Sequence, residues 1–192
     1  MVSVVLPTLG RKEGLERCLK SIEKLNYPKD RIETIVIEDE PRLGVPRRVW
    51  EGYQKATGDI ICFAANDIEF TPNSLLIAVS DYMKTGKRLI AFDTGVRNEF
   101  GYICEHFIIH RSLVEQLGEI FSFKLKHFAA DTLLWDKASK LGDAYQSKGF
   151  VHHYHYSRIG SGIEMDDINK LVVGDIESDR AIYAKELKKL GV

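Results

Sequence analysis

Two carboxylates stand one residue apart in the segment Asn66-Asp67-Ile68-Glu69, between an apolar run and a helix start. On an extended segment, residues two apart point to the same side, so Asp67 and Glu69 would face one ligand together. Such hard oxygen ligands suit a divalent cation that also binds substrate phosphates. The alternative is a helix-entry turn whose Asp and Asn side chains cap backbone N–H groups, and the pattern fits both interpretations.

A second candidate for metal binding is the histidine-rich run at 152–155. His153 and His155 share a face if this run is extended, and a neutral imidazole is a common metal ligand. No cysteine or histidine pair stands nearby in the sequence to complete a closed structural zinc site. The alternative is a half-buried aromatic strand in which each histidine is structural.

Two further acids stand at the ends of predicted elements. Asp131 begins a predicted helix directly after the small residues Ala129 and Ala130. It is either an acid stabilised by the helix N-terminus or a general base that accepts a proton from an acceptor hydroxyl. Asp39 ends a predicted strand, where an acid can hydrogen-bond a ribose hydroxyl or a base, or where it simply belongs to an exposed acidic turn. Arginines near the same strand ends are candidates for neutralising a pyrophosphate: Arg11, Arg42, Arg47 and Arg48.

The elements that position these residues alternate between strand and helix along the first half of the chain. Apolar and β-branched runs predict strands at 2–6, 32–37, 60–64, 89–92, 103–109 and 150–156. Helical spacing and helix-start signals predict helices at 13–25, 46–56, 72–84, 112–117, 131–141 and 175–190. This order predicts an α/β domain with a mainly parallel central sheet and flanking helices. Ligands bind beyond the carboxyl ends of such strands, so the polar turns should meet at one edge.

The composition is that of an ordinary globular protein of 192 residues, with 27 basic and 28 acidic side chains and a net charge of −1. This balance gives no support for nucleic-acid binding. The sequence contains neither GxGxxG nor a P-loop, which argues against a dinucleotide-dependent dehydrogenase and a P-loop NTPase. We expect a single domain over 1–192, with a nucleotide-binding half at 1–94, a catalytic half at 95–160 and a C-terminal tail at 161–192.

Cellular location is predicted from cysteine usage and apolar patterning. The three cysteines are far apart and fit reduced thiols, as in a cytoplasmic protein. The first residues resemble a strand rather than a signal peptide, and no apolar run approaches the roughly 18 residues of a membrane span. The helix at 175–190 carries lysines beside leucines. We favour a solvated surface helix, and the alternatives are peripheral contact with an anionic inner membrane surface or with a second copy of the chain.

Taken in order, these motifs resemble glycosyltransferase family 2, which has the GT-A fold, over about residues 2–158. The matching segments are Val2-Ser3-Val4-Val5-Leu6-Pro7-Thr8, the strand ending at Asp39, Ala56-Thr57-Gly58-Asp59-Ile60-Ile61, Asn66-Asp67-Ile68-Glu69, Phe128-Ala129-Ala130-Asp131 and the run at 151–155. The acidic segment departs from the DxD pattern of that family, because Ala65 or Asn66 stands at its first acid. Of the family's Glu-Asp pair, only Asp131 is present.

The resemblance implies an inverting transfer of a sugar from a nucleotide-diphosphate donor to an acceptor hydroxyl, dependent on Mn²⁺ or Mg²⁺. It implies that Asp131 is the catalytic base and that Asp67 and Glu69 bind the metal together with a histidine, His155 in preference to His153. It places the following residues at the nucleotide: Pro7, Thr8, Arg11, Asp39, Asn66 and Asp67. The acceptor would be a saccharide, a lipid-linked sugar, a protein or a small molecule.

Two other functions fit parts of the pattern. A nucleotidyltransferase that makes a nucleotide sugar would share the α/β architecture, but usually has a glycine-rich basic loop after the first strand, where this chain has only Gly10 followed by Arg11 and Lys12. A catalytically silent nucleotide-sugar-binding module would explain the incomplete acidic motif. Release of pyrophosphate separates the first alternative from a transferase, and hydrolysis of the donor separates the second.

Overall fold

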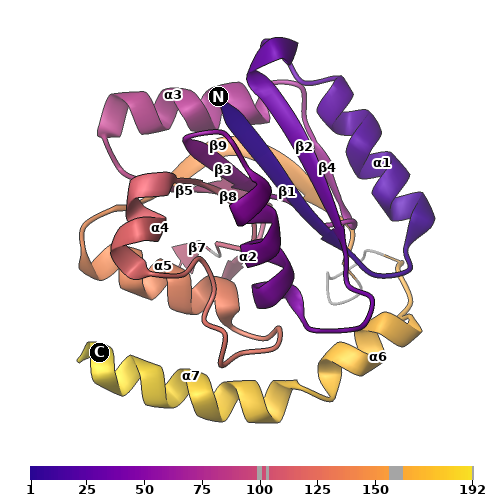
Figure 1. Ribbon diagram of the computed structural model, residues 1–192, viewed down its shortest axis with the longest axis vertical. Coiled ribbons are helices and arrows are strands. Elements are labelled where there is room, and N and C mark those ends of the chain that lie inside the picture. Colours follow the sequence, from indigo (N-terminus) through magenta and orange to yellow (C-terminus); the bar gives the residue numbers. More distant parts are fainter. Residues whose placement is uncertain (99–100, 103, 156–161, 192) are drawn as a thin grey trace.

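The computed structural model describes residues 1–98, 101–102, 104–155 and 162–191 (Figure 1). A seven-stranded sheet has the order β2-β1-β3-β8-β5-β9-β4, with helices on both faces. Its strands are β1 (Val2–Thr8), β2 (Ile32–Glu38), β3 (Ile60–Phe63), β4 (Ile68–Phe70), β5 (Leu89–Asp93), β8 (Phe107–His110) and β9 (Ala144–His153). The helices are α1 (Lys12–Glu23), α2 (Val45–Lys55), α3 (Ser74–Thr85), α4 (Arg111–Leu117), α5 (Ala130–Lys140), α6 (Asp167–Val173) and α7 (Ile176–Leu190). A short 3-10 helix spans Lys29–Arg31, and β6 (Arg97–Asn98) pairs with β7 (Gly101–Tyr102).

The α/β fold class is confirmed, but the sheet is mixed where we predicted mainly parallel pairing. β1 pairs parallel with β2 and β3, and β5 pairs parallel with β9. β8 pairs antiparallel with β3 and β5, and β4 pairs antiparallel with β9. Parallel neighbours need a crossover of about a dozen residues or more, usually a helix. The chain between the neighbours β5 and β8 holds no helix among its described residues, and these two strands pair antiparallel.

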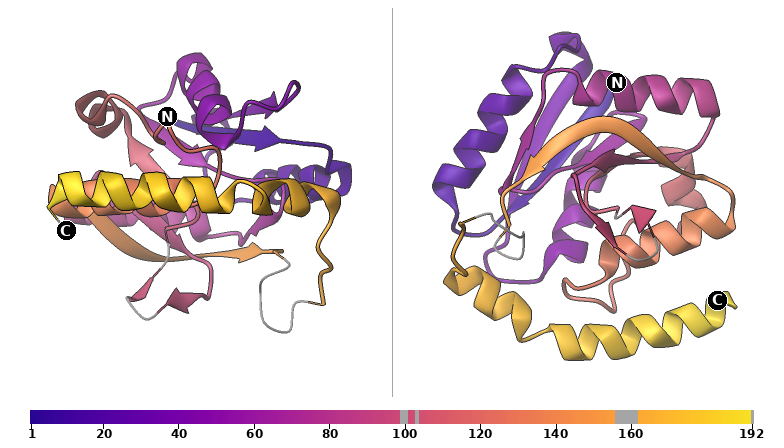
Figure 2. Two further views of the ribbon diagram at one scale, coloured as in Figure 1. Left: turned by 90° about the horizontal axis from the view of Figure 1, so that it is seen from below. Right: turned by 180° about the vertical axis from the view of Figure 1, so that it is seen from behind.

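The sheet is buried on both faces because its apolar strands alternate their side chains between two cores. Along β1, Val4 and Leu6 face the core beneath α1 and α3, while Val5 faces the core beneath α2, α4 and α5. Burial on both sides explains why β1 is mostly apolar, as is typical of central strands in α/β folds. The sheet is strongly curled, and β9 arches across the back of the molecule (Figure 2).

The C-terminal segment contains one helix that the sequence predicted, α7, and one that it did not, α6. The two helices run along one end of the molecule, beyond the carboxyl ends of β1 and β2 (Figure 1). α6 begins with a capping box in which Asp166 and Asn169 exchange side-chain and backbone hydrogen bonds. Among the helices of the described residues, none has the length and apolar character needed to cross a bilayer.

Candidate active site

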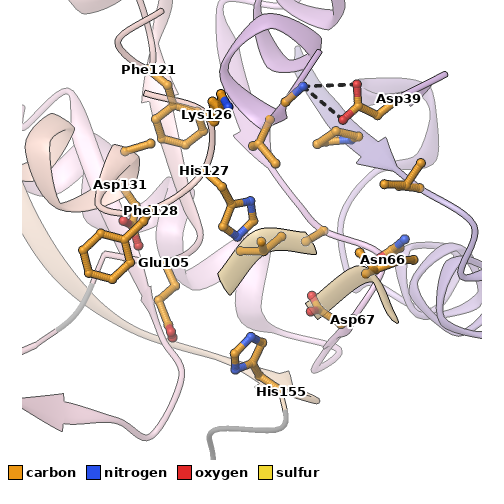
Figure 3. Close-up of a pocket in the computed structure, with 18 of the residues that line it drawn as sticks. Asp39, Asn66, Asp67, Glu105, Phe121, Lys126, His127, Phe128, Asp131 and His155 are labelled. Atoms are coloured by element: carbon orange, nitrogen blue, oxygen red, sulfur yellow. Dashed lines mark hydrogen bonds between the residues drawn. The ribbon is translucent and has the colours of Figure 1, made fainter. Parts of the chain in front are cut away.

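A cavity of about 530 Å³ lies where the carboxyl ends of the strands meet the C-terminal helices. Asp39, Asp67 and Asp131, which are far apart in the sequence, all line it. The predicted convergence of the acid-bearing turns is therefore observed. In Figure 3, Asp131 and Glu105 lie on one side of the cavity, and Asp67 lies on the other. A ligand in this space would have carboxylates on both sides.

Asp67 stands beside two histidines in the wall of the cavity. One side-chain ligand atom from each of Asp67, His106 and His153 lies within 4.8 Å of the other two. Three separate parts of the fold supply them, since Asp67 lies in the turn between β3 and β4, His106 precedes β8, and His153 ends β9. A carboxylate with two imidazoles is a donor set that first-row divalent metals accept, so these residues fit a bound cation.

The opposite charges of Asp67, His153 and Glu105 stabilise one another's ionised forms. Nε2 of His153 lies 3.6 Å from Oδ1 of Asp67, and Nδ1 lies 3.4 Å from Oε2 of Glu105. Burial alone would lower the pKa of His153, but these two carboxylates outweigh it and raise the pKa to about 9. Burial alone would raise the pKa of Asp67, but His153, His106 and Arg11 together hold it well below its ordinary value. Asp67 is therefore an anion throughout the physiological pH range.

Asn66 and Asp67 are held in place by tight packing against β1 and α1. Nδ2 of Asn66 donates to the hydroxyl of Thr8 at 2.8 Å. A Cβ on Gly14 of α1 would come within 2.2 Å of the Asn66 carbonyl oxygen, so only glycine lets the helix approach this closely. The hydrogen bond and the glycine together fix the turn that carries Asp67.

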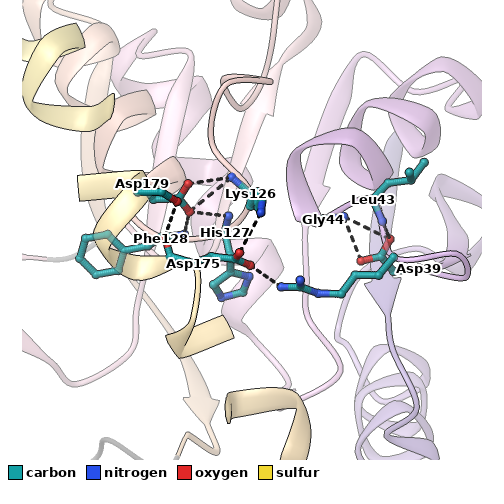
Figure 4. Close-up of polar contacts among 10 residues, drawn as sticks. Asp39, Leu43, Gly44, Lys126, His127, Phe128, Asp175 and Asp179 are labelled. Atoms are coloured by element: carbon teal, nitrogen blue, oxygen red, sulfur yellow. Dashed lines mark hydrogen bonds and ion pairs between the residues drawn. The ribbon is translucent and has the colours of Figure 1, made fainter. Parts of the chain in front are cut away.

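Asp39 lines the cavity, but its carboxylate also organises its own loop (Figure 4). It accepts hydrogen bonds from the backbone N–H groups of Leu43 at 2.7 Å and Gly44 at 3.1 Å, and Nε of Arg48 donates to it at 3.0 Å. Gly44 has φ of 91°, and a Cβ there would lie 2.6 Å from the carbonyl oxygen of Lys126. Asp39 thus shapes the wall of the cavity where α2 begins, in addition to any contact with a ligand.

Asp131 lies in the first turn of α5, where its Oδ1 accepts a hydrogen bond from the backbone N–H of Thr132 at 2.8 Å. The preceding Ala129 has φ of 57°, a left-handed conformation that is unusual for a residue with a Cβ. Burial raises the pKa of Asp131 to about 6, and the nearby charge of Glu105 adds to this effect. The carboxylate is therefore ionised at neutral pH and is a stronger base than an exposed aspartate.

The loop before α5 is tied to α7 by a buried carboxylate (Figure 4). Asp179 is fully buried and accepts hydrogen bonds from the backbone N–H groups of Lys126 at 3.1 Å, His127 at 2.9 Å and Phe128 at 2.8 Å. One turn earlier in the chain, Asp175 pairs with the ammonium group of Lys126 at 3.1 Å. Asp175 also pairs with Arg42 across the cavity at 2.6 Å.

Most of the residues that the sequence predicted for the site line the cavity: Pro7, Thr8, Arg11, Asp39, Asn66, Asp67, Asp131, His153 and His155. Glu69 does not. Glu69 lies beside α1 instead. Its carboxylate accepts a hydrogen bond from the hydroxyl of Tyr154, which follows β9, at 2.8 Å. The prediction for Glu69 assumed an extended segment, but Asp67 lies in a turn and only Ile68–Phe70 is extended, so the two acids point apart.

The histidines beside Asp67 do not include the one that the sequence favoured as a metal ligand. We favoured His155, and its ring lies beside that of His153 with centroids 5.4 Å apart, but the group with Asp67 is completed by His153 and His106. Sequence reasoning missed His106 because it stands alone before an apolar strand. Only the antiparallel pairing of β8 with β3 brings it next to Asp67. Of the remaining arginines, Arg42 lines the cavity, whereas Arg47 lies over the ring of Phe123.

Neither a protein-family model nor a curated protein sequence matches the chain. Solved structures do match it. A mannosyltransferase from Pyrobaculum calidifontis, in complex with GDP-Man and Mn²⁺, aligns with a TM-score of 0.69 at 18% identity, over 81% of this chain and 57% of its own. S. aureus TarS residues 1–349, in complex with UDP-GlcNAc, aligns with a TM-score of 0.68 at 15% identity, over 96% and 66%.

A third solved structure is glucosyl-3-phosphoglycerate synthase from Mycobacterium tuberculosis, in complex with Mn²⁺, UDP and glucosyl-3-phosphoglycerate. It aligns with a TM-score of 0.66 at 15% identity, over 100% of this chain and 80% of its own. The chain thus spans less than two thirds of the length of the first two neighbours. These likenesses show that the mixed, curled sheet and its helices have the GT-A-type fold of glycosyltransferases.

Proposed function

We propose that this chain is a glycosyltransferase of the family 2 type, which moves a sugar from a nucleotide-diphosphate donor to an acceptor hydroxyl with inversion. The observation that carries the proposal is the cavity itself. It brings Asp67, His106 and His153, whose ligand atoms would suit a cation, and the carboxylate of Asp131 around one space in a GT-A-type fold, which supports the proposal. An inverting displacement needs a base and a leaving-group site on different sides of the sugar.

Asp67, His106 and His153 would hold the divalent cation. When bound, it supplies Lewis-acid stabilisation of the diphosphate that leaves the sugar. Imidazole ligands suit Mn²⁺ better than Mg²⁺, which prefers oxygen, so we propose Mn²⁺ as the preferred ion. Arg11, whose Nη1 lies 3.3 Å from Oδ2 of Asp67, would add a guanidinium to the same phosphates.

The nucleoside would lie against Pro7, Thr8 and Asn66 beside Asp39, at the ends of β1 and β2. This part of the cavity lies beyond the carboxyl ends of the strands, where ligands bind in open α/β sheets. The donor sugar would then point toward Asp131. That carboxylate would accept the proton of the incoming acceptor hydroxyl as the hydroxyl attacks the anomeric carbon, with no covalent enzyme intermediate.

The proposal is tested by incubating the protein with Mn²⁺ and a panel of UDP- and GDP-sugars, and measuring free nucleoside diphosphate with and without saccharide acceptors. We expect release from at least one donor and its loss in Asp131→Asn. Asp59→Asn is a matched control, because this carboxylate is 77% exposed and far from the cavity wall. Pyrophosphate release from a nucleoside triphosphate and a sugar phosphate would instead identify a nucleotidyltransferase. Donor binding without any turnover would identify a silent binding module.

A further inference from the structure

Glu105 lies in the wall of the cavity, one residue before His106, and contacts two other segments of the chain. The hydroxyl of Thr94, just after β5, donates to Oε2 of Glu105 at 2.8 Å. The same oxygen lies 3.4 Å from Nδ1 of His153, at the end of β9. A carboxylate that is only 19% exposed is thereby held between a hydroxyl and an imidazole.

The two nitrogens of His153 face different partners. Nδ1 faces Glu105, and Nε2 faces Asp67, whose Oδ1 lies 3.6 Å away. A neutral imidazole carries a proton on one nitrogen and a lone pair on the other. Because each nitrogen has its own carboxylate, His153 can keep its Nδ1 proton on Glu105 while Nε2 gives up its proton and offers its lone pair to a cation beside Asp67 and His106.

We propose that Glu105 is a positioning residue that fixes the ring and tautomer of His153, so that Nε2 is presented as a metal ligand. This inference rests on the proposed function, since it concerns the cation that Asp67, His106 and His153 would hold. Thr94 supports it by orienting the carboxylate of Glu105. Carboxylates that accept from the second nitrogen of a ligating histidine stabilise metal sites in this way.

Packing alone does not account for an acid at this position. Glu105 stands on the same side of the cavity as Asp131, so the two negative charges repel (Figure 3). Sequestering a carboxylate from water is costly unless it is paired. The contact with His153 compensates that cost, and it links Glu105 to the cation-binding group rather than to the proton-accepting carboxylate.

The experiment measures Mn²⁺ affinity by titration, following the electron paramagnetic resonance signal of the free ion. Glu105→Ala should weaken Mn²⁺ binding by about ten- to a hundredfold, which is the usual effect of removing a residue that hydrogen-bonds a metal ligand. Glu105→Gln keeps an acceptor oxygen and should recover most of that loss, and Thr94→Val should give a smaller loss than Glu105→Ala. Glu115→Ala, an exposed glutamate of α4, is the matched control and should bind like wild type.

Circular dichroism melting identifies any variant that fails to fold. If Glu105→Ala does not fold, the Mn²⁺ affinities of Glu105→Gln and Thr94→Val still test whether Glu105 supports metal binding. Wild-type protein that binds Mn²⁺ and a folded Glu105→Ala that binds it equally well would overturn this inference alone. Wild-type protein that does not bind Mn²⁺ would overturn the cation site of the proposed function as well. Lost turnover in Glu105→Gln with unchanged affinity would make Glu105 a base instead.

Discussion

Arg11 binds both carboxylate oxygens of Asp166, through Nε at 2.7 Å and Nη2 at 2.9 Å. The same guanidinium reaches Asp67 through Nη1. One side chain therefore connects the proposed metal ligand with the residue that caps α6. The positive charge that would meet the diphosphate of a donor is shared with an acid of the C-terminal segment, so Asp166 and the phosphates would compete for it.

Asp166→Asn should strengthen nucleoside diphosphate binding, because it leaves Arg11 with one fewer anionic partner. The gain should be about two- to fivefold, the size expected when a partly exposed ion pair is lost. Asparagine is as good an N-cap as aspartate, so α6 should keep its first turn. Calorimetry measures the change, and Asp167→Asn is the control, since that side chain is 95% exposed. Weaker binding by Asp166→Asn with α6 intact would mean that this acid helps to hold the donor.

Asp131→Asn should lower turnover by about a hundred- to ten-thousandfold, which is the usual contribution of a general base. Donor affinity should stay within a factor of about two, because the amide replaces the carboxylate at nearly the same size. In wild type, kcat should fall as the pH drops below about 6, where Asp131 becomes protonated. Initial rates at saturating donor from pH 5 to 8 measure this, and a flat profile would remove Asp131 from proton transfer.

The same substitution should stabilise the fold at neutral pH. The pKa of Asp131 is about 6 in the folded protein and about 3.8 in an unfolded chain, so the folded state binds the proton more tightly. Wild-type stability should therefore fall as the pH rises from about 4 to 6. Asp131→Asn has no such titration. Its free energy of unfolding should therefore exceed that of wild type by about 1–3 kcal/mol at pH 7.5, and the difference should disappear near pH 4. Urea unfolding at both pH values measures the difference, and an equal difference at both would contradict the assigned pKa.

The histidines give a test that separates the structure from the sequence prediction. His106→Ala and His153→Ala should each weaken Mn²⁺ binding by more than about tenfold, because each removes a proposed ligand. His155→Ala should change it by less than about threefold, because His155 lies outside the group of three. Calorimetric titration with Mn²⁺ compares the three variants. Weaker Mn²⁺ binding in His155→Ala alone would identify His155 as the ligand, as the sequence predicted.

Local signals in the sequence were enough to find Asp67 and Asp131. Each follows or begins a predicted element, and the rule that ligands bind beyond strand ends predicted that they would share a cavity with Asp39. The apolar runs also predicted β1, β2, β3 and β5 closely. These features depend on residues that are adjacent in the chain, so they can be predicted from a single sequence.

The parts that were missed depend on long-range pairing. His106 becomes a neighbour of Asp67 only because β8 inserts between β3 and β5 in the antiparallel sense. Glu69 was assigned to the wrong side because a turn at Asp67 rotates the chain before β4 begins. α6 was missed because its seven residues give little periodicity, and its start depends on the capping box of Asp166.

The most direct test of the central claim is calorimetric titration of the wild-type protein with UDP, GDP and their monophosphates, with Mn²⁺ present and after chelation. If Asp67, His106 and His153 hold a cation that meets a diphosphate, one of the two diphosphates should bind at least about tenfold more tightly with Mn²⁺. The monophosphates should gain much less, and Asp67→Asn should abolish the Mn²⁺ effect. Equal affinities for diphosphate and monophosphate, unchanged by chelation, would contradict the account.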